Sequence, residues 1–280
     1  MTTGTIATTT PLTASVSQRS TTFSDTLASE WVKLTTLRST YITLGLGVVL
    51  SIAMTALVSL AVGTTFDSWS IAEQMQFEPI LFSMAGNVVT LIALSVFGVL
   101  AAAGEYSTGM IRLTLTATPK RGRVLLAKLL LVSGITMVLG LITVTGMFLV
   151  GQAVAGAYGM PVADLGDADA RRLVIGLSAV TPLFPILGFA LGVILRSTAG
   201  AITAVLGMLW LPIIFGGLLP AWWQENVLSL LPGSAVDSVT IAHVAESPMY
   251  SDPAIGALIV VAWLAGFIGA AYASLSRRDA

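Results

Sequence analysis

The chain has no cysteine among its 280 residues and only one histidine, His243. Without cysteine, disulfides, thiolate metal sites and catalytic thiols are excluded. One histidine cannot by itself build a haem site or a multi-histidine metal site. Charge is scarce too, because 10% of the residues are charged, against about 25% in soluble domains. The net charge of -1 provides no basic footprint for nucleic acid.

Nucleotide-binding and hydrolase motifs are also missing from the sequence. No segment matches the phosphate-binding pattern G-x-x-x-x-G-K-[ST]. Gly104 and Gly109 have the spacing of its two glycines, but Met110 and Ile111 follow where lysine and serine or threonine are needed. The histidine has no G-x-S-x-G context that would indicate a serine hydrolase. We therefore predict a protein that is not an enzyme, with no catalytic residue, no metal site and no cofactor of its own.

Long apolar runs fill most of the sequence, with 55% hydrophobic residues and a mean hydropathy of +0.91. So much apolar surface needs lipid as its solvent, and a helix of ~20 residues crosses the ~30 Å hydrocarbon layer. Continuous apolar runs favour helices over the alternating strands of a barrel. We predict an all-α integral membrane protein with spans at residues 41–63, 80–103, 129–151, 173–195, 199–219 and 254–275. None of these spans contains Asp or Glu, which argues against a proton-coupled carrier.

Lysine and arginine determine the predicted orientation, because cytoplasmic loops carry an excess of both. If the N-terminus is inside, the outer segments hold only Arg171 and Arg172. The prediction is a multi-pass plasma-membrane protein with both termini in the cytoplasm. The predicted cytoplasmic segments hold Arg19, Lys33, Arg38, Arg112, Lys120, Arg121, Arg123, Lys128, Arg196, Arg277 and Arg278.

Two segments before the first span differ in character. Residues 1–22 are rich in Thr and Ser, and we expect a disordered tail ahead of a single transmembrane domain at residues 23–280. Residues 23–38 predict an amphipathic helix at the cytoplasmic interface, with Ser24 as its N-cap. It would anchor the chain to the membrane surface, whether or not it also contacts a partner. Its apolar face holds Phe23, Leu27, Trp31 and Leu34, and its polar face holds Asp25, Ser29, Glu30 and Lys33.

The connection before the last span, residues 220–253, is unusually apolar for a loop. Trp222 and Trp223 suit a membrane interface. The run at residues 227–231 is too short to span and predicts a shallow re-entrant or interfacial helix that stops at Pro232. A second short helix is expected at residues 235–244. An ordinary outer loop is the alternative.

Small, polar and helix-bending residues lie in or near the spans. Gly188 and Gly192 form a GxxxG pair that permits close helix contact. The prolines predict kinks, either fixed or part of a gate. The polar residues either join helices or line a path. These residues are Pro182, Pro185 and Pro212, and Asn87, Thr90, Thr136, Thr143, Thr145 and Gln152.

The best candidate for a functional site is the basic loop between the second and third spans, GEYSTGMIRLTLTATPKRGRVLLAK at residues 104–128. A short helix is expected at residues 106–118, ended by Pro119. Glu105 lies at the end of a span and needs a cationic partner there, for which Arg112 or Arg123 is expected. The loop is either a docking helix with a basic base or a solvated turn whose charges only set topology.

This loop resembles the signature loop of ABC-2 type permeases, the membrane subunits of ATP-driven bacterial transporters. The opening segment SEWVKLTTLRSTYI resembles the family's interfacial helix, LRSTAGAI at residues 195–202 its inner turn, and WWQENVLSLLPGSAV its outer re-entrant helices. The resemblance covers most of residues 23–278. The matching loop residues are Glu105, Gly109, Arg112, Pro119, Arg121, Gly122, Arg123 and Lys128.

The resemblance implies a permease subunit without an ATPase domain, whose coupling helix fits a groove in a separate ATP-binding cassette subunit. ATP and Mg²⁺ would bind to that partner, and a second permease copy, identical or related, would complete the transporter. Coupling would depend on Glu105, Arg112, Pro119, Arg121 and Arg123. Export of a small amphipathic, drug-like or antibiotic-like substrate is expected, and no substrate-binding residues are assigned. An ATP-independent carrier, or a non-transporting immunity or sensor component, remains an alternative.

Overall fold

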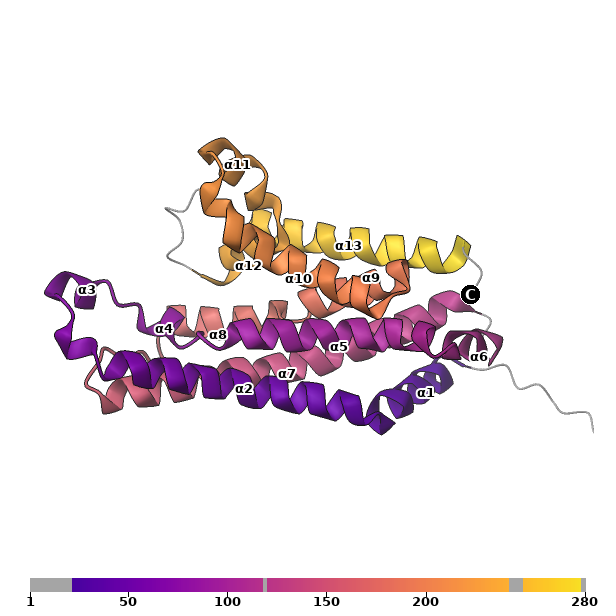
Figure 1. Cartoon of the computed structure of the whole chain (residues 1–280), viewed down its shortest axis with the longest axis horizontal. Coiled ribbons are helices and arrows are strands. Elements are labelled where there is room, and N and C mark those ends of the chain that lie inside the picture. Colours follow the sequence, from indigo (N-terminus) through magenta and orange to yellow (C-terminus); the bar gives the residue numbers. More distant parts are fainter. Residues whose placement is uncertain (1–21, 118–119, 242–248, 278–280) are drawn as a thin grey trace, which may run out of the picture.

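The computed structural model describes residues 22–117, 120–241 and 249–277, and this part of the chain contains helices and no strand. Six helical segments are long and apolar enough to cross a membrane. They run roughly along one long axis (Figure 1). They are α2 (Arg38–Gly63), α5 (Asn87–Ser107), α7 (Arg121–Ala157), α8 with α9 (Ala168–Val180 and Leu183–Leu195), α10 (Thr198–Phe215) and α13 (Pro253–Arg277).

Short helices lie at the two ends of this bundle. One end holds α1 (Phe23–Thr36), α6 (Met110–Ala117) and the last turn of α13, and the other holds α3 (Ile71–Met75) and α11 (Ala221–Asn226) (Figure 1). We call the first the basic end, because it carries Lys33, Arg38, Lys120, Arg121, Arg123, Lys128, Arg196 and Arg277. We call the second the acidic end, because it carries Asp67, Glu73, Glu78, Asp164, Asp167, Asp169, Glu225, Asp237 and Asp252.

The third span is longer than predicted, since α7 has 37 residues instead of the 23 of residues 129–151. At about 1.5 Å per residue it is about 55 Å long, well beyond the ~30 Å hydrocarbon layer. The predicted span stopped short of two polar residues, Lys128 and Gln152, whose side chains have partners in the fold. Lys128 is ion-paired, and the Gln152 side-chain nitrogen donates to the Pro79 carbonyl at 2.8 Å.

The second span starts later than predicted, because α4 (Pro79–Phe82) and a turn precede α5. Gly86 in this turn lies against α2, where a Cβ would be 1.9 Å from the carbonyl oxygen of Ser51. The Gly86 amide donates to Thr55 Oγ1 at 3.0 Å. The span also ends later, at Ser107, so Glu105 lies in its last turn. Glu105 thus continues the spanning helix just beyond the predicted end of the span at residue 103.

The fourth span is broken at Thr181 and Pro182 into α8 and α9, so the predicted kink at Pro182 is present as a break. Beyond it, α9 packs closely on α5. Cβ atoms at Gly188 and Gly192 would lie 2.8 Å from the Ser95 carbonyl oxygen and 3.0 Å from the Ala102 methyl group. The GxxxG pair thus has the close helix contact expected of it.

One packing signal in the first span was not anticipated. Small residues recur at every fourth position of α2, so they form one stripe along the helix. All five are buried, and the stripe faces α5 and α7. The Thr90 hydroxyl of α5 donates to the Ser51 hydroxyl of this stripe at 2.8 Å. Thr90 therefore joins α5 to α2. The stripe consists of Gly47, Ser51, Thr55, Ser59 and Gly63.

The connection before the last span is folded into short helices rather than an open loop. They are α11, a 3-10 turn at Leu228–Leu230 and α12 (Pro232–Thr240). Pro232 is the first residue of α12, so it begins a helix as well as ending the apolar run. The indole nitrogen of Trp263 in α13 donates to the Leu230 carbonyl at 2.8 Å and ties these helices to the last span.

Candidate functional site

At the basic end, α6 lies between α5 and α7 in the sequence, and a tight turn separates it from α5. Gly109 has φ of +71°, a left-handed conformation that favours glycine, and it lets the chain reverse directly after α5. Ile111 is buried, while Leu113 is 72% exposed and points away from the bundle. Met110 is 44% exposed, so α6 presents two apolar side chains at its surface.

The structure places the predicted site residues in different surroundings. Arg112 lies in α6, but its side chain is outside the described part, and Pro119 is outside it altogether. Arg121 and Arg123 lie in the first turn of α7 and are half-buried. Arg121 Nη1 donates to the carbonyl oxygen of Leu275 at 2.8 Å, which ties the start of α7 to the end of α13.

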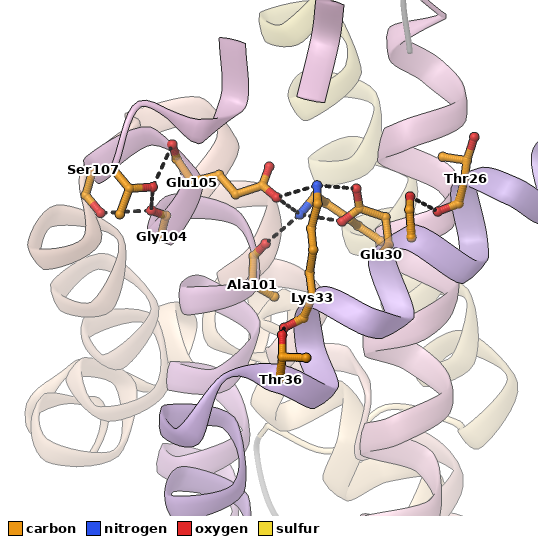
Figure 2. A network of polar contacts seen from close by, with 11 residues as sticks. Thr26, Glu30, Lys33, Thr36, Ala101, Gly104, Glu105 and Ser107 are labelled. Atoms are coloured by element: carbon orange, nitrogen blue, oxygen red, sulfur yellow. Dashed lines mark hydrogen bonds and ion pairs between the residues drawn. The ribbon is translucent and has the colours of Figure 1, made fainter. Parts of the chain in front are cut away.

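Glu105 belongs to a buried network of four charges from three helices (Figure 2). Its Oε1 lies 3.0 Å from Lys33 Nζ of α1 and 2.9 Å from Lys128 Nζ of α7. Glu30 of α1 completes the network, with Oε1 2.7 Å from Lys33 Nζ and Oε2 2.9 Å from Lys128 Nζ. Figure 2 shows the two carboxylates on either side of the lysine ammonium groups. We call these four residues the charge network.

The charge network is nearly closed to solvent, since Glu30, Lys128 and Glu105 are 1%, 8% and 9% exposed. Two negative and two positive charges balance, so no net charge is buried. Lys128 Nζ also donates to the Ala101 carbonyl at 3.3 Å. Because Glu30, Glu105 and Lys128 have lost most of their water, removing any one of these three leaves an opposite charge uncompensated. The Lys33 side chain is 28% exposed and keeps part of its water.

The structure gives Glu105 two cationic partners, Lys33 and Lys128, that the sequence did not indicate. The prediction that Arg112 pairs with Glu105 lies outside the described part, because the Arg112 side chain does. Glu30, from the predicted polar face of α1, is buried and pairs with Lys128 of α7. Trp31, from the predicted apolar face, is 48% exposed.

The start of α1 also differs from prediction. Its N-cap is Thr22, whose hydroxyl accepts from the Asp25 amide at 3.2 Å, while the Asp25 carboxylate accepts from the Thr22 amide at 2.9 Å. This reciprocal capping box replaces the predicted cap at Ser24. The cap fixes where the helix begins and thus the register that brings Glu30 and Lys33 to α5.

The charge network shifts the titration of Lys33. Desolvation lowers the pKa of this lysine, but hydrogen bonds and attraction to Glu30 and Glu105 outweigh it, and the net pKa is raised above 10.5. Lys33 therefore stays charged throughout the physiological range. Lys33 thus keeps its positive charge in both ion pairs near neutral pH.

A second contact extends from the end of α5 to the turn between α9 and α10. The Arg196 guanidinium carbon lies 5.3 Å from the centre of the Tyr106 ring, within cation–π range. Arg196 ends α9 in a left-handed conformation with φ of +52°. The Ser197 hydroxyl then accepts from the Gly200 amide at 3.2 Å and caps α10. The inner turn seen in the sequence thus packs beside the end of α5.

The charge network could have been found from two sequence signals. Lys128 lies inside an apolar run, VLLAKLLL, where a charge needs a partner. Glu30 and Lys33 are three residues apart on one helical face and can join such a cluster. Neither signal names its partner, because pairing across helices is not visible in one sequence.

Comparison with known proteins identifies the family. The family model described as ABC-2 family transporter protein matches residues 71–280. The match covers three quarters of the chain, so the chain belongs to this family, as the basic loop and the outer helices predicted. No curated protein matches the chain.

Proposed function

We propose that this ABC-2 family transporter protein is a permease subunit that a separate ATP-binding cassette subunit drives from the basic end. The proposal places the basic end and both termini in the cytoplasm of a plasma-membrane protein. The Lys and Arg content of that end supports this orientation under the positive-inside rule. ATP and Mg²⁺ would be held by the partner, and a second permease copy, identical or related, would complete the transporter.

The observation that carries the proposal is the way α6 is mounted. It connects the end of α5 to the start of α7, and an ion pair joins those two helices at its base, with Lys128 Nζ 2.9 Å from Glu105 Oε1. An ATP-binding subunit seated on Leu113 would therefore push α5 and α7 together rather than separately. The charge network passes the displacement on to α1.

The cation–π contact of Tyr106 with Arg196 connects the same displacement to α9 and α10. In this mechanism, ATP binding closes the partner subunits, α6 moves with them, and the spans rock as linked units. We infer outward transport of a small amphipathic or drug-like molecule. Export is the family's usual direction, and the residues that the structure describes form no large outer domain that would suit a larger cargo.

The test is co-purification of the tagged full-length chain from its host's membranes in mild detergent. A stoichiometric ATP-binding subunit is expected, and L113E should lose it, because a charge on α6 opposes an apolar groove. The matched control is M75E, at an equally exposed position (82%) of the acidic end, which should retain the partner. Leu113 is a better target than Arg121, because the Arg121 side chain also donates a hydrogen bond to α13.

Two outcomes would contradict the proposal. In one, the wild-type chain purifies alone and crosslinking finds no ATP-binding subunit, which favours the carrier and immunity alternatives. In the other, L113E and M75E retain the partner equally, which places docking elsewhere. Equal amounts of the variants in the membrane fraction must be shown first.

A further inference from the structure

Two adjoining pockets open at the acidic end. One, of about 640 Å³, lies among α3, α4, α5, α8 and α12, and the other, of about 190 Å³, lies deeper against α9 and α10. They share Asn87, Leu91, Leu177 and Asp237, so we treat them as one two-part cavity, the outer cavity. Its size suits a small organic molecule.

The walls of the outer cavity are mainly apolar and aromatic. Trp69, Phe77 and Phe82 line one side and contact one another, with Phe77 and Phe82 ring centres 5.0 Å apart. Leu91 and Leu177 line the opposite side. Aromatic faces carry negative potential and attract cations as well as apolar groups.

Asp237 in α12 places a carboxylate in these walls without a partner. Among the residues that the structure describes, no group donates a hydrogen bond or an ion pair to it, and the side chain is exposed to the cavity. Desolvation by the surrounding groups raises the pKa of Asp237 to about 6. Asp237 is exposed as a residue, so this desolvation comes from the groups that line the cavity around its carboxylate, and a cation brought beside it there is screened by less water than on an open surface.

The other charged groups around α12 are already engaged or lie at the rim. Glu73 Oε2 accepts from the Ser70 amide and hydroxyl at 2.8 and 2.7 Å, and Glu78 lines the outer part of the cavity. Arg172 of α8 donates through Nε to the Val239 carbonyl at 3.4 Å. Asp252, before α13, accepts from the Ala254 amide at 2.9 Å.

We propose that the outer cavity binds organic cations with an apolar body, and that Asp237 is their anionic anchor. The apolar part would lie against the aromatic and leucine walls, and the positive charge beside the carboxylate. The inference deepens the proposed function by naming the substrate class. Binding itself needs no ATP-binding subunit, so it can be tested apart from transport.

The probe is tetraphenylphosphonium, a cation that does not titrate, and its near-isosteric anion tetraphenylborate is the charge control. Binding is measured on the purified full-length protein in lipid nanodiscs, with empty nanodiscs subtracted. The cation should bind and the anion should bind at least tenfold more weakly. Between pH 7.5 and pH 5, protonation of a group with a pKa of about 6 should weaken cation binding about tenfold.

D237N should weaken cation binding at pH 7.5 about tenfold or more and remove the pH dependence. D67N removes the same charge at the acidic end outside the cavity lining and should bind like the wild type. H243Q should keep the pH dependence, which excludes the chain's single histidine as its source. Equal binding of cation and anion, or unchanged binding and pH dependence in D237N, would overturn the proposal. Cation binding without an ATP-binding partner in the co-purification would retain this site and reject the ATP-driven mechanism.

Discussion

Replacing Lys128 by methionine should lower the free energy of unfolding by about 3–5 kcal/mol, the usual cost of removing one partner of a buried ion pair. Lys128 Nζ lies 2.9 Å from carboxylate oxygens of both Glu30 and Glu105. At an effective dielectric of about 20, each contact at that distance attracts by about 6 kcal/mol, and the desolvation cost of the buried lysine, several kcal/mol, cancels a large part of that sum. Methionine returns only about 1–2 kcal/mol through apolar burial. The loss of attraction between Lys128 and the two carboxylates therefore outweighs the gain from burying methionine. Glu30 and Glu105 are left with Lys33 as their remaining partner in the charge network.

The assay is equilibrium unfolding in mixed micelles of mild and denaturing detergent, followed by the fluorescence of the six tryptophans. The matched control is K120M, which removes an exposed charge at the same end and should change stability by less than about 0.5 kcal/mol. The double variant E105Q/K128M restores charge balance. It should be less destabilised than the sum of its two single variants, with a coupling of about 1–3 kcal/mol.

Two results would refute this reasoning. K128M could match the wild type within about 0.5 kcal/mol, which would show that the network carries no net stability. The single effects could instead add in E105Q/K128M, which would show that Glu105 and Lys128 act independently. Either result would also remove the link that we propose between α6 and its flanking helices.

Three further predictions use the same unfolding assay. G98A should destabilise the protein by about 3 kcal/mol, at the upper end for overpacking, because its Cβ would lie 2.0 Å from a carbonyl oxygen of α9. G134A, with nothing within 4 Å, should be neutral or slightly stabilising. T22A should cost about 1 kcal/mol as the loss of an N-cap, and S24A should cost nothing measurable. The folded-state pKa of Lys33 is raised above 10.5, so its contribution to the free energy of unfolding is complete below that pH and is lost as the pH rises above it. K33M lacks this contribution and should therefore lose less stability than the wild type as the pH rises beyond 10.5.

The spans could be predicted from composition because lipid imposes one requirement on every residue of a run. Helical segments lie at all six predicted places. The boundaries failed where tertiary contacts override hydropathy. Gln152 and Lys128 continue α7 because partners on other helices satisfy them, and Gly86 delays α5 because it packs against α2.

The site was harder to predict than the spans, because its geometry depends on pairing between distant segments. Glu105 was recognised as an acid that needs a cation, but the cations lie 72 residues before it and 23 after it in the sequence. The sequence pattern of α1 predicted that the segment is helical. It did not predict that Glu30, on the polar face, would be buried. Helical periodicity distinguishes two faces, but which face is buried depends on the charges on neighbouring helices.

The central claim is that an ATP-binding cassette subunit docks on α6, and the absence of cysteine makes a direct test possible. A single cysteine at Leu113, labelled with a photo-crosslinker in the host's membranes, should join the chain to an ATP-binding subunit. The same label at Met75, on the acidic end, should give no such product. A crosslink from Met75 but not Leu113, or no ATP-binding subunit from either, would contradict the account.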